Sequence, residues 1–227
     1  MGDRAAKDAL YDAFADAARA LASGRRAEVV DLLAQGERSV EEIATELDQS
    51  VANTSHHLRA MARAGLVGTR RDGTRVYYRL ASERVAELWT ALRDVAADHV
   101  AGLDRLAAAY LGERDGVEVV DRQELAARLK RGEVLVLDVR PPAEFAAGHI
   151  RGARSVPIGE LRRHVRALPR DADVVAYCRG RYCVYADDAV RQLTRKGFRA
   201  RRLVDGYPEW KRSGLPIGVG EQGEQEE

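Results

Sequence analysis

The sequence predicts two domains, a mainly α-helical domain with one β-hairpin, followed by an α/β domain built on a parallel sheet. Up to residue 111, apolar side chains recur at helical spacing and only one stretch has a hairpin pattern. Beyond residue 116, short apolar strands alternate with helical patterns, which is typical of parallel strands joined by helices. A short polar run separates the two patterns. The expected parts are domains at 1–112 and 113–216 and an acidic, disordered tail at 217–227.

The composition indicates a soluble globular protein, because 45% of the 227 residues are hydrophobic and 32% are charged. No apolar run is long enough to span a membrane, and the charged N-terminus does not resemble a signal peptide. Two cysteines are too few for a disulfide framework. We therefore expect a cytoplasmic protein without a membrane partner. The net charge of +1 says nothing about nucleic acid.

Several local signals place the elements of the first half. A capping box at 39–42 opens a short helix through Leu47, and Ser50 caps the next helix. The Asp72-Gly73 pair marks the turn of a hairpin. The expected helices are 5–22, 25–35, 40–47, 51–64 and one long helix at 82–111.

Two short helices followed by a hairpin form the layout of a winged helix-turn-helix, whose second helix enters the major groove of DNA. Thr54, Leu58 and Met61 should face the core, since they are spaced four and three residues apart. Asparagine, serine and arginine side chains on the outer face can read bases, and arginines on the wing can neutralise phosphates. A helical module that binds protein with the same helix is the alternative. The expected DNA-binding residues are Ser50, Asn53, Ser55, His56, Arg59, Arg70, Arg71 and Arg75.

The segment 55–67 resembles the recognition helix of the ArsR/SmtB family of bacterial repressors, and 20–26 and the wing resemble the same family. The resemblance covers about residues 5–110. It implies a homodimer, joined through the first and last long helices, on a palindromic double-stranded DNA operator.

This sequence departs from the family at the positions where many relatives bind metals. The segment 40–47 has no cysteine, and Asp94, His99 and Asp104 are five residues apart, a spacing that does not stack side chains on one helical face. We therefore expect no metal site, and no cofactor.

Both cysteines of the chain lie in one six-residue stretch, Cys178 to Cys183, between an apolar strand at 174–177 and a helical pattern at 184–196. A thiol in this position lies near free backbone N–H groups and the positive end of a helix, which favours the thiolate. Two arginines in the stretch add to this effect. The sequence therefore predicts a reactive sulfur.

The segments 137–145, 148–153 and 205–210 and the cysteine loop resemble the rhodanese family, in the expected order. The resemblance covers about 117–216. It implies a rhodanese-type sulfurtransferase in which Cys178 takes sulfane sulfur from thiosulfate or a related donor, holds it as a persulfide and passes it to a thiol or cyanide. Six residues make a shorter loop than that of the related phosphatases, so a phosphatase is not expected. The expected substrate-binding residues are Arg179, Gly180, Arg181, Tyr182 and Cys183.

For three further residues the sequence suggests a structural role or leaves two alternative roles open. Asp138 and His149 are expected to be structural, and a catalytic triad of both with Cys178 is the disfavoured alternative. Cys183 is either a packed side chain at the start of the helix or a resolving thiol that attacks the persulfide.

Taken together, the two halves predict a DNA-binding regulator, acting as a repressor, in which persulfidation of Cys178 is the signal and enzyme activity is subordinate to regulation. Every thiol of the chain lies in the second half, which favours this hypothesis. One alternative is a sulfurtransferase whose DNA-binding half does not sense sulfur. Another is an inactive rhodanese fold that binds an effector.

Overall fold

A computed structural model of the chain describes residues 2–112, 114 and 116–220. Its contacts divide the chain into two compact units, Met1–Val100 and Ala101–Glu227. The division falls earlier than the boundary expected at residue 112. Each unit has its own hydrophobic core, and the two are described separately.

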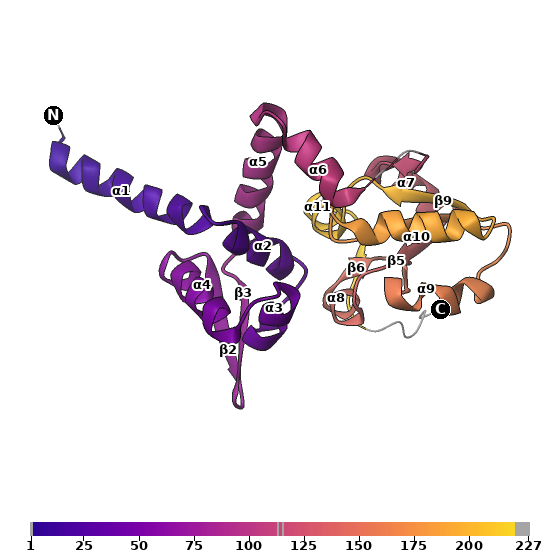
Figure 1. The fold of residues 1–227 in the computed structure, drawn as a ribbon, viewed down its shortest axis with the longest axis horizontal. Helices are drawn as coiled ribbons and strands as arrows, with labels where there is room; N and C mark the ends of the chain where they lie inside the picture. The colour runs from indigo at the N-terminus through magenta and orange to yellow at the C-terminus, as the bar shows by residue number, and fades with distance from the viewer. Residues whose placement is uncertain (1, 113, 115, 221–227) are drawn as a thin grey trace. The chain divides into compact units, whose positions relative to one another are not determined.

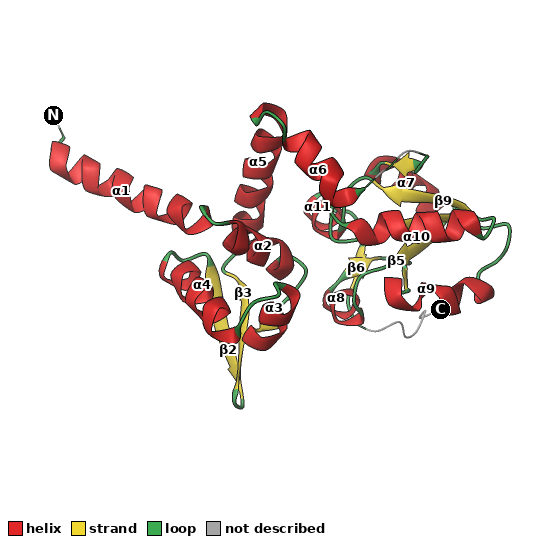
Figure 2. Cartoon of the chain, viewed as in Figure 1, coloured by secondary structure: helices red, strands yellow, loops and turns green. Residues whose placement is uncertain are grey.

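The first unit is a winged helix-turn-helix, as the sequence predicts (Figure 1). Three strands form one antiparallel sheet in the order β1-β3-β2, and the long β2–β3 hairpin is the wing (Figure 2). The elements are α1 (Arg4–Leu21), α2 (Gly24–Leu33), β1 (Arg38–Ser39), α3 (Val40–Glu46), α4 (Val51–Arg63), β2 (Val67–Asp72), β3 (Arg75–Leu80) and α5 (Glu83–His99).

Helix caps place the helix-turn-helix as predicted. The Ser39 side chain accepts the Glu42 N–H while the Glu42 side chain accepts the Ser39 N–H, which completes the capping box of α3. The Ser50 hydroxyl accepts the Asn53 N–H at the start of α4. The predicted core face of α4 is confirmed, since its three residues are fully buried and two of them, Leu58 and Met61, join the apolar core of the unit.

Two predictions about connections were wrong in detail. The hairpin turn is Gly73-Thr74, because Asp72 still pairs with Arg75 across the strands. Gly73 has φ 56°, so it occupies the first turn position that requires positive φ. The expected single helix at 82–111 is broken at Gly102, which has φ 83°, a left-handed conformation that ends the helical backbone.

The second unit is an α/β fold around a five-stranded parallel sheet in the order β4-β9-β8-β5-β7. A short antiparallel pair, β6–β10, lies outside that sheet. The elements are α6 (Leu103–Leu111), β4 (Val119–Val120), α7 (Arg122–Lys130), β5 (Leu135–Asp138), α8 (Pro142–Ala147), β6 (His149–Ile150), β7 (Arg154–Ser155), η1 (Ile158–Glu160), α9 (Leu161–His164), η2 (Val165–Ala167), β8 (Asp173–Tyr177), α10 (Val184–Arg195), β9 (Arg199–Leu203), α11 (Tyr207–Arg212) and β10 (Ile217–Gly218).

The sheet is covered on both faces, which explains why its central strands are continuously apolar. One core joins strand side chains to α9 and α10, and another joins them to α7, α8 and α11. Alternate residues of β8 serve the two cores, with Val174 and Ala176 on one side and Val175 and Tyr177 on the other. The loop that follows β8 is therefore anchored in the centre of the sheet, at the carboxyl ends of its strands.

The chain beyond α11 differs from the expected tail at its start. Ile217 and Gly218 form β10 and pair with β6, so these two residues are part of the folded unit. Residues 221–227 of the expected tail lie outside the described residues. Among the described residues, no helix combines the length and apolar character that a membrane crossing requires.

Candidate functional site

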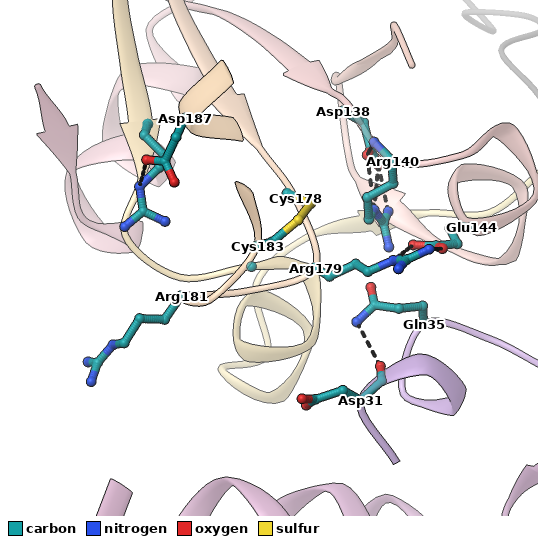
Figure 3. The surroundings of a disulfide bond; sticks show 12 residues. Asp31, Gln35, Asp138, Arg140, Glu144, Cys178, Arg179, Arg181, Cys183 and Asp187 are labelled. Carbon is teal, nitrogen blue, oxygen red and sulfur yellow. Dashed lines mark hydrogen bonds and ion pairs between the residues drawn. A yellow bond between two sulfur atoms is a disulfide. The ribbon is translucent and has the colours of Figure 1, made fainter. Parts of the chain in front are cut away.

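The predicted reactive sulfur lies directly after β8, and the structure joins it to the second cysteine. Cys178 and Cys183 form a disulfide, with their Cα atoms 6.3 Å apart (Figure 3). Cys178 is 1% exposed and belongs to the core between the sheet and α10, and the half-buried Cys183 packs against the same core. In this oxidised form Cys178 has no free thiol, so a sulfur donor can react only after the bond is reduced.

The backbone of the cysteine loop is held from inside and from the segment before α11. The Cys183 N–H donates to the Gly180 carbonyl at 3.1 Å, and the Tyr207 N–H donates to the Cys178 carbonyl at 3.1 Å. Gly206 lies so close that a Cβ there would be 2.3 Å from the Gly180 nitrogen and 2.4 Å from the Arg179 carbonyl carbon. Only glycine fits this contact, because the atoms that it meets are backbone.

Arg179 is paired with a buried carboxylate. Its Nε lies 3.0 and 3.1 Å from the two Glu144 oxygens, and its Nη2 lies 2.5 Å from Oε1 (Figure 3). The Glu144 side chain on α8 is completely buried, whereas 22% of the Arg179 side chain is exposed. This bidentate ion pair fixes the first loop residue after Cys178. Substrate binding by Arg179 stays a prediction.

The other predicted substrate-binding residues lie at different depths. Gly180 is buried, Tyr182 is half-buried and Arg181 is exposed. Figure 3 shows the Arg181 side chain pointing away from the disulfide. Its backbone carbonyl accepts a hydrogen bond from Arg114, so the backbone of Arg181 has a partner of its own within this unit.

A second charged cluster holds the start of α10. Arg114 donates from Nε and Nη2 to Asp187 Oδ2, at 3.0 and 2.6 Å, and from Nη2 to the Arg181 carbonyl at 3.0 Å. Asp187 is completely buried and also lies 3.3 Å from Nε of Arg202 on β9. Arg114 therefore ties the polar segment that precedes β4 to both the cysteine loop and the helix after it.

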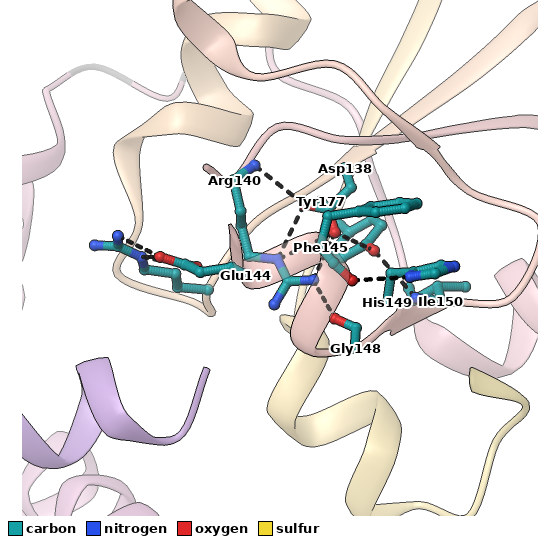
Figure 4. Close-up of polar contacts among 9 residues, drawn as sticks. Asp138, Arg140, Glu144, Phe145, Gly148, His149, Ile150 and Tyr177 are labelled. Atoms are coloured by element: carbon teal, nitrogen blue, oxygen red, sulfur yellow. Dashed lines mark hydrogen bonds and ion pairs between the residues drawn. The ribbon is translucent and has the colours of Figure 1, made fainter. Parts of the chain in front are cut away.

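Asp138 forms a buried network with its neighbours rather than with a cysteine (Figure 4). Its oxygens accept from the backbone and guanidinium of Arg140 and from the Tyr177 hydroxyl. Arg140 also donates to the Gly148 carbonyl at 2.8 Å. Burial, and then the negative charge of Asp138, raise the pKa of the Tyr177 phenol well above its usual value. The network thus keeps Tyr177 neutral and joins β5, β8 and the end of α8.

His149 also has a structural environment. Its Nδ1 donates to the Phe145 carbonyl at 2.9 Å, and its ring stacks on the Phe145 ring with a centroid distance of 3.7 Å. These hydrogen bonds join His149 and Asp138 to residues other than Cys178, and the structural roles suggested by the sequence stay predictions.

The predicted base-reading residues lie along α4. Asn53, His56 and Arg59 are exposed and Ser55 is half-buried. Ser50 serves as the helix cap, and the Asn53 amide donates to Gln49 at 2.6 Å. The face opposite the buried side of α4 thus presents polar side chains to solvent, as a recognition helix requires.

The wing arginines are all exposed, but they differ in their partners. Arg70 is held by Glu37, with Nη2 2.7 Å from Oε1, and by Asp72 at 3.2 Å. These carboxylates and their hydrogen bonds raise the pKa of Arg70 further above its usual value. Because its charge is already compensated, we expect Arg70 to neutralise a phosphate less effectively than Arg71 does.

Sequence reasoning missed several residues that shape the cysteine loop. Glu144, Gly206 and Arg114 contact it although they are far from it in the chain. The acid within the apolar stretch of α8 was a usable signal, because a buried carboxylate needs a cationic partner. Within residues 2–112, 114 and 116–220, no group of three His, Cys, Asp or Glu side chains is arranged to hold a metal ion.

Comparison with known proteins agrees with both halves of the structure. The arsR family model of bacterial regulatory proteins matches residues 23–69, and the rhodanese-like domain model matches residues 121–213. HTH-type transcriptional regulator Rv0324 of Mycobacterium tuberculosis is 47% identical over 214 residues, which cover 94% of each chain. A sulfurtransferase of Allochromatium vinosum is 38% identical over 103 residues, 44% of this chain and 94% of the relative.

A solved structure is also similar to the first half. It is the homodimeric winged helix-turn-helix DNA-binding domain of a possible ArsR-family regulator from Mycobacterium bovis, with 48% identity and a TM-score of 0.41 over 44% of this chain and 91% of that chain. The fold, the two family models and the relative from Mycobacterium tuberculosis together define a two-domain transcriptional regulator, in which a winged helix-turn-helix is followed by a rhodanese-like domain. The chain belongs to the arsR family of bacterial regulatory proteins, which confirms the resemblance seen in the sequence.

Proposed function

We propose that this chain is a cytoplasmic repressor whose affinity for its DNA operator depends on sulfur carried by Cys178. The observation that carries the proposal is the position of Arg114. This residue lies in the second unit shortly after α6, and it bonds to the cysteine loop through the Arg181 carbonyl. A change in the loop is therefore felt at Arg114, close to α6, which is the helix of this unit nearest in sequence to the DNA-binding half.

The sulfur chemistry rests on Cys178 in its reduced form. Its thiolate attacks the sulfane sulfur of thiosulfate or a related donor, the donor's S–S bond breaks, and sulfite or its equivalent leaves with the electron pair. Cys178 then carries a persulfide at the end of a strand, where loop amides and the N-terminal end of α10 favour negative charge. A thiol or cyanide can remove the outer sulfur.

Coupling requires that the modified and unmodified loops differ in free energy between the DNA-bound and free protein. An added sulfur changes the charge and volume within a loop that Gly206 and Glu144 hold tightly. The bond from Arg114 to the Arg181 carbonyl then has a different strength in the two states. In this proposal Arg114 transmits the difference.

The DNA-binding half acts as a homodimer in this proposal. Large apolar side chains of α1 and α5 are exposed in the single chain, among them Tyr11, Phe14 and Leu92 at 61, 62 and 47%. Such faces are usually covered by a partner, and the similar Mycobacterium bovis domain is described as homodimeric. Light scattering should give about twice the chain mass of 25.0 kDa.

The test compares wild type, Cys178→Ser and Arg114→Ala. Each protein is reduced and treated with thiosulfate, the modification of Cys178, as the persulfide or as the disulfide with Cys183, is identified by intact mass, and operator affinity is measured before and after. The proposal expects affinity to change only where Cys178 is present, and expects Arg114→Ala to keep the modification of Cys178 while losing most of the change. Turnover with unchanged affinity in wild type supports the sulfurtransferase alternative, and the absence of both persulfide and turnover supports an effector-binding module.

A further inference from the structure

The second cysteine of the loop is placed to react with the first. Cys178 and Cys183 are bonded in the structure, and their Cα separation of 6.3 Å lies within the range of about 4.4–6.8 Å that disulfides adopt. No other cysteine exists in the chain, so neither thiol has a competing partner within it.

The loop conformation that brings the sulfurs together does not depend on the disulfide alone. Hydrogen bonds from the Cys183 and Tyr207 N–H groups, and the close approach of Gly206, hold the loop backbone. The Arg179–Glu144 ion pair fixes the residue next to Cys178. The two thiols are therefore expected to stay close when the bond is reduced.

Cys183 also occupies a position that favours its reactive form. It is the N-cap residue of α10, a helix of 12 residues, and its side chain makes no capping hydrogen bond. The positive end of the helix favours a thiolate there. Cys183 thus combines proximity to Cys178 with an environment suited to a nucleophile.

We infer that Cys183 is a resolving thiol, and that the loop reduces sulfane sulfur to sulfide. The inference rests on the proposed persulfide at Cys178. The Cys183 thiol first loses its proton to water, and the resulting thiolate attacks Sγ of Cys178. The bond between Sγ and the outer sulfur breaks, and the outer sulfur leaves with the electron pair and takes a proton from water as hydrosulfide.

The electron balance of this step closes within the chain. The two cysteines lose two electrons and become the disulfide that the structure contains, and the sulfane sulfur gains the same two electrons. With thiosulfate as donor, one turnover yields one sulfite and one sulfide. An external dithiol must then reduce the disulfide by exchange, which restores both thiols for the next cycle.

The oxidised product is also a closed state. Cys178 is 1% exposed and covalently blocked, so a second donor cannot react until the dithiol has acted. The Cys183 thiol of the same loop therefore removes the bound sulfur as sulfide. A dithiol reductant is the partner that restores the two thiols.

A single-turnover experiment on the full chain tests the inference. Fully reduced protein, freed of reductant under anaerobic conditions, is mixed with thiosulfate, and sulfite, sulfide and intact mass are measured. Wild type should release about one sulfite and one sulfide per chain and lose the mass of two hydrogen atoms. Cys183→Ser should release sulfite, gain the mass of one sulfur atom and release less than about a tenth of the wild-type sulfide.

Two further measurements separate the possible failures. Cyanide, which removes the outer sulfur directly, should release thiocyanate from the persulfide of Cys183→Ser, and circular dichroism should show that the variant is folded. A wild-type chain that keeps the added sulfur and releases no sulfide would overturn the resolving role while leaving the persulfide intact. Absence of sulfite in both proteins would instead overturn the persulfide itself, and Cys178→Ser gives the background for all products.

Discussion

The ion pair between Arg179 and Glu144 offers a quantitative test of how the cysteine loop is held. Replacing Arg179 by Met keeps most of the side-chain volume but removes the bidentate partner of a fully buried carboxylate. Breaking such a pair from one side costs about 3–5 kcal/mol. Glu144→Gln removes the negative charge instead, and the Arg179 side chain, 22% exposed, retains access to water. We expect a smaller loss of about 1.5–3 kcal/mol for that variant.

The double variant should be no worse than about 1–3 kcal/mol below wild type, because no buried charge is then left without this partner. Guanidinium unfolding of the full chain measures these differences, and a Trp89→Phe background leaves Trp210 as the reporter of the rhodanese-like domain. The reasoning predicts strong coupling between the two sites. Effects of the two single variants on the free energy of unfolding that add to within about 0.5 kcal/mol would refute it. If Arg179→Met raises the KM for thiosulfate both in the presence of Glu144 and in the Glu144→Gln variant, Arg179 is instead assigned to donor binding.

Three other outcomes follow from the structure. Gly206→Ala forces a Cβ against the loop backbone, so it should cost about 1–3 kcal/mol and sharply reduce sulfur transfer, whereas Gly159→Ala, with open space around it, should do neither. Arg71→Ala should flatten the slope of log affinity against log salt by about 0.9, and the paired Arg70→Ala by less; equal slopes would contradict this. Burial and then Arg26 lower the pKa of His57, so the free energy of unfolding should fall as pH drops below 6.5. His57→Gln should remove that loss, and an identical pH dependence of the free energy of unfolding in wild type and variant would contradict the prediction.

The sequence was sufficient for the fold class and for most elements. Helical periodicity, caps such as Ser39 and Ser50 and the apolar run of β8 depend only on neighbouring residues. The helices and the strand that they predict are therefore present in the folded chain. The break at Gly102 was missed because one glycine is tolerated within many helical patterns. Two-residue strands such as β6 and β7 have no periodicity to recognise, since their existence depends on the partner strand.

The chemistry of the candidate site could be predicted from the sequence, but the contacts that hold the cysteine loop in place could not. The spacing of Cys178 and Cys183 was visible, whereas their bond depends on how the loop folds back. Contacts such as Arg179 with Glu144 join residues that are 35 positions apart, and Arg114 reaches Asp187 across 73 positions. No single-sequence pattern encodes such pairs, because they arise only when the parallel strands bring their carboxyl ends together.

The central claim is that sulfur on Cys178 sets operator affinity. The most direct measurement is the dissociation constant of the full chain for its operator, determined by fluorescence anisotropy on reduced protein and on protein whose Cys178 modification has been verified by intact mass. The account predicts a change of about 5-fold or more, corresponding to a coupling free energy of about 1 kcal/mol or more. Identical dissociation constants for the reduced and modified protein would contradict it.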